Sequence, residues 1–186
     1  LLLHRIYSRE RRADDARRVL AQALAVVGPD RQQALVDYLC SGLDADALRG
    51  LEPDDATFEG LGPLMLEGCA GHLDALAELA SRNDPPREVA LRLRTQANLK
   101  LERPLLARYF GRQWVGLAPT SAAAHAAWTD TLRLEPGADA SEVEVEVRDH
   151  LRQALRTQKL DDPALLEELV LWSLKRSASR EELARS

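Results

Sequence analysis

The feature that most constrains this chain is a series of apolar stripes at helical spacing, separated by residues that end or begin helices. In each stripe the apolar positions recur every three or four residues, as they do on one face of an α-helix. The first stripe consists of Ala16, Leu20, Ala23, Leu24 and Val27. Only 4% of the residues are aromatic, and Leu and Ala, which are good helix formers, dominate the apolar positions. We therefore expect an all-α fold in which helices pack on helices.

The helix start and stop signals divide the chain into roughly eight to ten helices. Helices are expected over residues 8–27, 30–41, 44–51, 63–81, 86–101, 105–115 and 121–132, with more after residue 141. Residues 52–63 are rich in acids, glycine and proline and are expected to be a connection. No fixed repeat period relates the segments. We expect an irregular multi-helix bundle, with a short α-solenoid as the alternative.

Residues 142–147 allow two interpretations. Glu and Val alternate through this segment, which is typical of a strand. Ser141 and Glu144 also fit a capping box, and Val143, Val147 and Leu151 continue at helical spacing. A helix is the favoured interpretation, and a small β-hairpin near 131–147 is the alternative.

The core is predicted from the centres of the stripes. The residues expected to be buried are Leu24, Leu73, Leu106, Trp128 and Leu169. The clearest break between stripes is Asn83-Asp84-Pro85-Pro86. It predicts an acidic N-terminal half over 1–82 and a C-terminal half over 86–186 that begins with a basic segment, unless the chain forms one continuous domain. Because no initiating Met is present, we expect the chain to be a fragment of a longer protein.

Charge is distributed unevenly along the chain, whose net charge is −5. Residues 42–80, the acidic segment, carry nine acids and one base, a net charge of −8. Residues 82–112, the basic segment, carry eight bases and three acids, a net charge of +5. The two segments are expected to interact with each other, with another copy of the chain or with a charged partner.

The two cysteines, Cys40 and Cys69, are too few for a disulfide framework. Free thiols are the favoured interpretation, as in cytosolic proteins, and a single bridge is the alternative. No apolar run approaches the ~20 residues that a membrane span needs. Together these features predict a soluble, cytoplasmic protein with no membrane partner.

No arrangement of residues in the sequence indicates catalysis, a cofactor or a metal. Cys69 with His72 and Glu146 with His150 each share a helix face, but a zinc or di-iron site needs further ligand pairs that the sequence lacks. No phosphate-binding glycine loop, nucleophile elbow or H-E-x-x-H motif occurs. We therefore predict a protein that is not an enzyme, with no catalytic residue, cofactor or small-molecule substrate identified.

The basic segment and the aromatic residue that follows it give the strongest functional signal. The candidate contacts for a partner or for nucleic acid are Arg87, Arg94, Arg103, Arg108, Arg112 and Trp114. Arginines bind phosphates, and exposed aromatic rings stack on unpaired bases. The favoured interpretation is a protein-interaction, scaffold or adaptor module that binds a protein partner or self-associates as an oligomer. Nucleic-acid binding through residues 82–112 is the alternative.

Residues 179–184, Ser-Arg-Glu-Glu-Leu-Ala, resemble the opening helix of helix-turn-helix domains. The resemblance covers six residues, and the recognition helix with which such domains contact DNA does not follow in this sequence. It therefore implies no more than the nucleic-acid alternative already considered.

Overall fold

The computed structural model describes residues 2–10, 12–26, 28–134, 143, 145, 147, 149 and 150. Its helices are α1 (Leu2–Arg9), α2 (Ala13–Val26), α3 (Pro29–Gly42), the 3-10 helix η1 (Ala45–Leu48), α4 (Asp55–Leu76), α5 (Glu78–Ser81), α6 (Glu88–Lys100), α7 (Pro104–Leu117) and α8 (Ala122–Arg133). None of the described residues lies in a strand, so the all-α prediction is confirmed. Within 142–147 the described residues are Val143, Val145 and Val147, and all three are helical.

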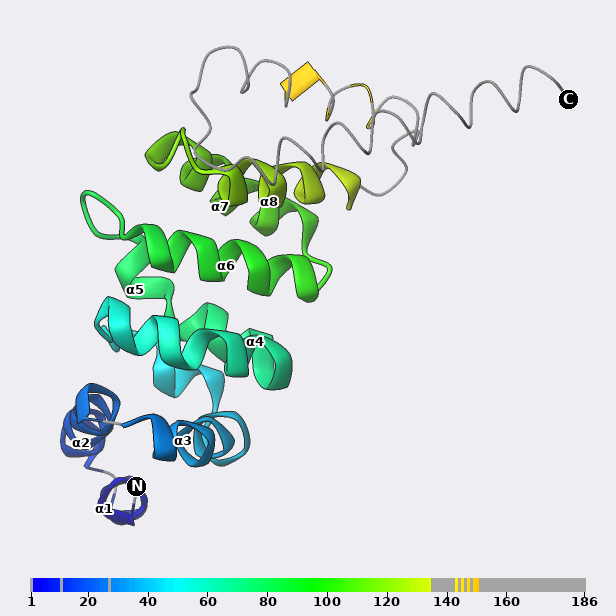
Figure 1. Cartoon of the computed structure of the whole chain (residues 1–186). Coiled ribbons are helices and arrows are strands. Elements are labelled where there is room, and N and C mark those ends of the chain that lie inside the picture. Colours follow the sequence, from blue (N-terminus) through cyan, green and yellow to red (C-terminus); the bar gives the residue numbers. More distant parts are fainter. Residues whose placement is uncertain are drawn as a thin grey trace, which may run out of the picture.

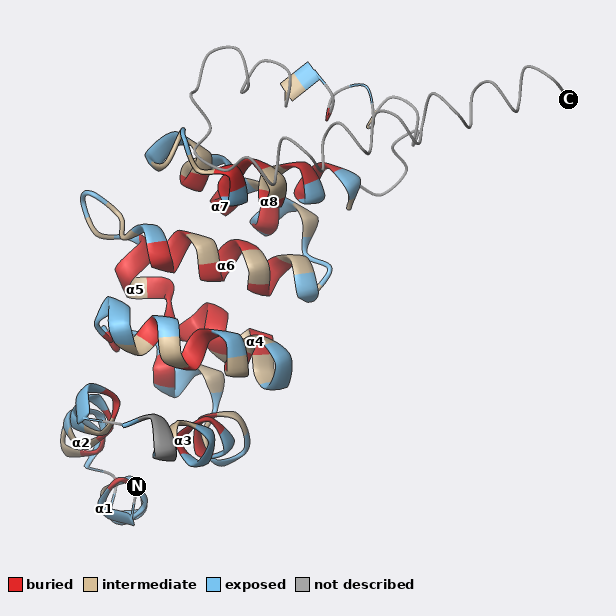
Figure 2. Ribbon diagram, viewed as in Figure 1, coloured by how far each residue is buried: buried red, intermediate tan, exposed pale blue. Residues whose placement is uncertain are grey.

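The helices stack in chain order, from α1 at one end to α7 and α8 at the other (Figure 1). α4 packs on α3 and on α6, and α7 packs on α6 and on α8. The buried residues lie on the faces between successive layers (Figure 2). One core cluster extends from Leu20 in α2 to Ala97 in α6 and so crosses residues 83–86. The division into two halves at that point stays a prediction.

The helix α4 consists of two arms joined at Cys69, whose backbone angles (φ −158°, ψ 65°) are not helical. Along the first arm, residues 55–68, the residue numbers of the basic ion-pair partners increase, from Arg87, just before α6, with Asp55 to Lys100, at the end of α6, with Glu67. Beyond Cys69 the direction reverses, and the backbone N–H of Arg87 donates to the Ala80 carbonyl. The two arms therefore form a helical hairpin, and we call residues 68–71 its turn.

The first arm begins within the segment that we expected to be a connection, so that expectation is wrong. The Asp54 carboxylate caps the helix by accepting from the backbone N–H of Thr57 at 2.8 Å. Phe58, Leu61 and Met65 follow at helical spacing and are each at most 1% exposed. Composition indicated a loop, but the cap and this apolar stripe decide the structure locally.

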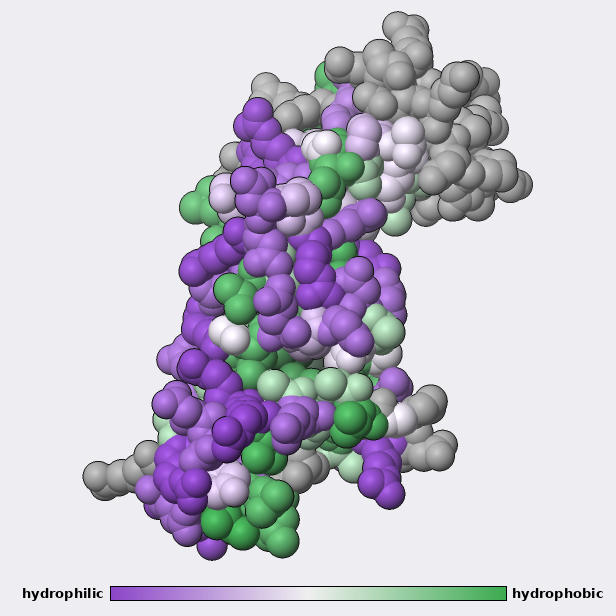
Figure 3. Space-filling model, turned by 90° about the vertical axis from the view of Figure 1, so that its left-hand side faces the viewer, coloured by the Kyte–Doolittle hydropathy of each residue, from purple (hydrophilic) through white to green (hydrophobic). Residues whose placement is uncertain are grey.

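Residues near the start of the chain are also helical earlier than expected. α1 precedes the first predicted helix, which begins as α2 at Ala13. The buried His4 ties α1 to α3, because the Tyr38 hydroxyl lies 2.7 Å from His4 Nδ1. Leu2, Leu3 and Ile6 remain exposed, and Figure 3 shows apolar side chains gathered at this end of the stack.

Cys40 and Cys69 form a disulfide, so the expectation of two free thiols is wrong. The cysteines are 29 residues apart, but the fold brings their Cα atoms to 5.6 Å, within the range that a disulfide spans. The argument for a cytoplasmic protein from free thiols therefore falls away. Among the described residues no helix is both long and apolar enough to cross a membrane.

Candidate interaction surface

The acidic and basic segments contact each other within the chain, which is one of the alternatives that the sequence left open. Four ion pairs join α4 to α6 and to Arg87, the residue that precedes it. They are Asp55 with Arg87, Glu59 with Arg92 at 2.6 Å, Asp74 with Arg94 at 2.8 Å and Glu67 with Lys100 at 2.7 Å. Much of the basic segment's charge is therefore balanced inside the molecule.

Arg94 lies in the core rather than on the surface. Its Nε donates to the Asp74 carboxylate at 2.8 Å and its Nη1 donates to the Ser81 hydroxyl at 3.0 Å. Its guanidinium carbon lies 3.9 Å from the centre of the Phe110 ring. Asn98 donates to the same Asp74 oxygen at 2.9 Å, and its own Oδ1 is buried without a partner among the described residues. This cluster joins the second arm of α4 and the following helix α5 to α6 and α7.

Two more of the predicted contact residues are also engaged internally. Arg87 donates from Nε to Asp55 at 2.8 Å and from Nη1 to the Pro53 carbonyl at 2.5 Å. Trp114 is 2% exposed, and its indole N–H donates to Glu88 at 3.1 Å. Both side chains fix the start of α6 against its neighbours.

Of the other three predicted residues, Arg103 directly precedes α7, and Arg108 and Arg112 lie within it. Arg103 and Arg112 are exposed, and neither forms an ion pair within the described part of the chain. Arg108 is half-buried, with its guanidinium carbon 5.8 Å from the centre of the Trp128 ring. The structure therefore divides the six candidates into three that make internal contacts, Arg87, Arg94 and Trp114, and three that are not buried, Arg103, Arg108 and Arg112.

The turn between α6 and α7 sets the position of Arg103. The backbone N–H of Arg103 donates to the Asn98 carbonyl at 2.9 Å, and that of Glu102 donates to the Leu99 carbonyl at 3.1 Å. These two bonds form a Schellman motif, which needs a left-handed residue between them. Glu102 takes that conformation with φ 51°. Pro104 then starts α7, where its missing N–H costs nothing.

The helix α7 carries large side chains on both of its sides. The side toward α6 and α8 is formed by Ala107, Phe110, Gly111 and Trp114, all buried. A Cβ on Gly111 would lie only 3.3 Å from Thr131 Cγ2, so α7 and α8 approach closely there. On the opposite side Leu105 is 83%, Tyr109 59% and Leu106 41% exposed. We call Arg103, Leu105, Leu106, Tyr109 and Arg112 the α7 outer face.

Exposure of Leu106 shows that its predicted burial is wrong. Leu24 and Leu73 are buried as predicted, Trp128 is half-buried, and Leu169 lies outside the described residues. Sequence reasoning also did not select Leu105 or Tyr109 as contact residues. Leu105, Tyr109 and Arg112 lie at i, i+4 and i+7 and so share one helix face. Because Phe110 and Trp114 already supply a buried apolar face on the other side of the helix, this spacing could have indicated a surface.

Among the described residues no group of three or more His, Cys, Asp or Glu side chains could hold a metal ion. Of the two pairs considered from the sequence, Cys69 is in the disulfide, and His72 lies 3.1 Å from the Leu43 carbonyl oxygen. His150 Nε2 lies 2.9 Å from His125 Nδ1, while Glu146 is outside the described residues. The segment that resembles a helix-turn-helix opening, residues 179–184, is outside them as well.

No protein-family model, curated protein or solved structure matches this chain.

Proposed function

We propose that the chain is a non-enzymatic helical interaction module whose α7 outer face binds an acidic amphipathic helix of a partner protein. The observation that carries this proposal is the exposure of Leu105 and Tyr109 between two arginines. Large apolar side chains that gather on one exposed face typically mark a binding site. Tyr and Arg are also enriched in protein interfaces.

Charge complementarity defines the chemistry of the partner. Arg103 and Arg112 lie at the two ends of the apolar part of the α7 outer face. No carboxylate among the described residues pairs with either of them. They are nine residues apart along the chain, which corresponds to roughly 13 Å on an α-helix. A partner helix with an apolar stripe on one side and carboxylates at both ends of the stripe would cover the exposed apolar side chains and pair with both arginines.

Nucleic acid fits this face less well than a protein helix does. Three of the six predicted contacts, Arg87, Arg94 and Trp114, are committed to internal contacts. The two leucines of the face have no ring on which a base could stack. Tyr109 between arginines is the one feature that favours single-stranded nucleic acid, so the binding test includes an oligonucleotide.

The test measures the binding of labelled probes by fluorescence polarisation. The first probe is a synthetic helix of about 14 residues, roughly four turns, with leucines at i, i+4 and i+7 and glutamates at both ends of that stripe. The second has lysines in place of the glutamates, and the third is an oligothymidylate. We expect the acidic peptide to bind and the basic peptide not to bind. We also expect Arg103→Glu with Arg112→Glu to weaken binding at least about tenfold, or ~1.4 kcal/mol.

Matched control substitutions lie far from α7. Val26→Asp changes a side chain that is 80% exposed, close to the exposure of Leu105, and Arg17→Glu reverses an exposed arginine on α2. Both should leave peptide binding unchanged, while Leu105→Asp should abolish it. Equal binding of the two peptides would refute the charge argument. Tighter binding of the oligothymidylate than of the acidic peptide would support the nucleic-acid alternative instead.

A further inference from the structure

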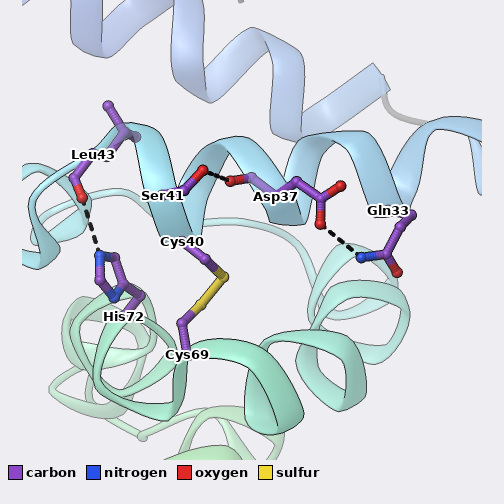
Figure 4. Close-up of a disulfide and its surroundings, with 7 residues drawn as sticks. All are labelled: Gln33, Asp37, Cys40, Ser41, Leu43, Cys69 and His72. Carbon is purple, nitrogen blue, oxygen red and sulfur yellow. Dashed lines mark hydrogen bonds between the residues drawn. A yellow bond between two sulfur atoms is a disulfide. The ribbon is translucent and has the colours of Figure 1, made fainter.

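The disulfide joins two elements at the edge of the stack. Figure 4 shows the bond between Cys40, in the last turn of α3, and Cys69, in the turn of the α4 hairpin. Beside it His72 lies 3.1 Å from the carbonyl oxygen of Leu43, the residue that follows α3. We propose that this disulfide is a redox-sensitive clamp, which a dithiol opens in the folded protein to release the hairpin turn from α3.

The two glycines of the hairpin turn add little to its packing against α3. A Cβ on Gly71 would meet no atom within 4 Å, and one on Gly68 would meet only the Cys40 sulfur, at 4.0 Å. The disulfide, with the hydrogen bond from the adjacent His72 to Leu43, therefore joins the turn to the end of α3, while the buried Ala70 joins it to the core. Opening the disulfide removes the covalent bond between the turn and α3.

The core beneath the disulfide is formed by other residues. Leu39 of α3 and Met65 and Leu73 from the two arms of α4 are each 0% exposed and belong to one cluster. At the first arm the Thr57 hydroxyl also donates to the Leu24 carbonyl at 3.2 Å. Because these contacts do not involve either cysteine, the stack is expected to stay folded when the disulfide opens. The change would be local.

The disulfide is also placed where a thiol can reach it. Cys40 and Cys69 are both half-buried, and their neighbours Ser41 and Gly68 are exposed. A thiolate of the dithiol attacks one sulfur, forming a mixed disulfide and releasing the other cysteine as a thiol. The second thiol of the dithiol then displaces the remaining cysteine. Two electrons and two protons pass to the cysteines, and the dithiol becomes a cyclic disulfide.

The test uses the full chain, purified under oxidising conditions, with dithiothreitol as the probe. Without denaturant, maleimide should label neither cysteine before reduction and both after it, as counted by mass. Hydrogen exchange should become faster in peptides that cover residues 38–44 and 66–72. It should be unchanged in α6 and α7, and the far-UV circular dichroism should keep its helical signal.

A double variant, Cys40→Ser with Cys69→Ser, provides the control. It should show the fast local exchange of the reduced chain and should not respond to dithiothreitol. Labelling of both cysteines before reduction would show that the disulfide does not form and would end the proposal. A disulfide that is reduced only in denaturant, identical exchange in the two forms, or loss of the helical signal on reduction would each overturn the clamp.

Discussion

Arg94 shows how one residue can have a role opposite to the one its charge suggests. Its place in a basic segment indicated a surface contact, yet it is 8% exposed and bonds to Asp74 and Ser81. A buried guanidinium is tolerated only where its donors and charge are satisfied. Asp74 supplies the charge, Ser81 an acceptor and Phe110 a ring face. The cluster thereby fixes how α4, α5, α6 and α7 meet.

Truncation of Arg94 should be strongly destabilising. Arg94→Ala leaves the Asp74 carboxylate buried without a cation, and the expected loss in the free energy of unfolding is about 3–5 kcal/mol, measured by urea denaturation. Arg94→Lys should recover only part of this, because an ammonium lacks the planar fork that reaches Asp74 and Ser81 together. The double variant Asp74→Ala with Arg94→Ala should lose less than the sum of the single losses. A loss below about 1 kcal/mol for Arg94→Ala would mean that the pair is not buried.

Glu102 carries backbone strain in the turn before α7. Its φ of 51° lies in the left-handed region, where glycine is the usual residue of a Schellman motif. Glu102→Gly should raise the free energy of unfolding by about 0.5–1 kcal/mol, because relief of strain outweighs the added flexibility of the unfolded chain. The matched control is Glu102→Ala, which keeps a Cβ and should bring no gain. Equal urea midpoints for the two variants would contradict this explanation.

At the scale of elements, α7 is distinguished by which of its two apolar sides is buried. The small residues Ala107 and Gly111 let α6 and α8 approach closely, and Phe110 and Trp114 fill the space beside them. Leu105 and Tyr109 have no such small neighbours and face outward. Helix packing therefore selects the side with the better fit rather than the one with more apolar surface. The unused side becomes the candidate interaction surface.

The start of α8 provides a test of local helix capping. The Ser121 hydroxyl accepts from the backbone N–H of Ala124 at 3.3 Å, and no acidic residue lies in the first turn to assist it. Ser121→Ala should therefore lower the free energy of unfolding by about 0.5–2 kcal/mol, whereas Ser121→Asp should retain the cap. Thermal unfolding of the three proteins side by side provides the measurement. Equal midpoints for Ser121→Ala and the parent would show that this helix end needs no cap.

At the scale of the whole molecule, charge separation along the sequence becomes charge pairing across one packing interface. The ion pairs between α4 and α6 lie along both arms of the hairpin, and all but Arg94 with Asp74 have at least one exposed partner. Exposed pairs contribute only about 0–1 kcal/mol each. Their main effect is on the register of the two helices, because they specify which residues of α4 lie beside which residues of α6.

Histidines toward the two ends of the stack predict how stability depends on pH. Burial lowers the pKa of His4. The pKa of His150 is lowered mainly by burial and to a smaller extent by electrostatic repulsion from His125. In the unfolded chain both should titrate near 6.5. As pH falls through that value, the unfolded state therefore binds more protons than the folded state, and stability is lost. Above about pH 6.5 this contribution is fully present.

Urea denaturation between pH 7.5 and 5.5 would measure this dependence. The parent chain should show a falling urea midpoint on acidification. His4→Gln removes one of the two titrating groups and should make the fall shallower, even if it lowers stability at every pH. A midpoint that stays constant or rises on acidification would show that these histidines are not shifted in the direction given.

The sequence by itself determined the helical class and most helix ends, and it identified two segments of opposite charge without deciding what each one contacts. These features depend on neighbours a few residues apart, such as the Ser121 cap or Pro104 at the start of α7, or on net charge, which needs no detailed geometry. The sequence also contained the spacing of Leu105, Tyr109 and Arg112, but not the reason to regard it as a surface.

The tertiary structure decided which groups are buried and which distant residues meet. The disulfide required Cys40 and Cys69 to be brought together from 29 residues apart. Burial of Arg94 depended on Asp74, Ser81 and Phe110, which come from three other elements. The outward side of α7 followed from the fit of its opposite side against α6 and α8. Such outcomes depend on packing among several helices at once, and no local pattern of residues encodes that packing.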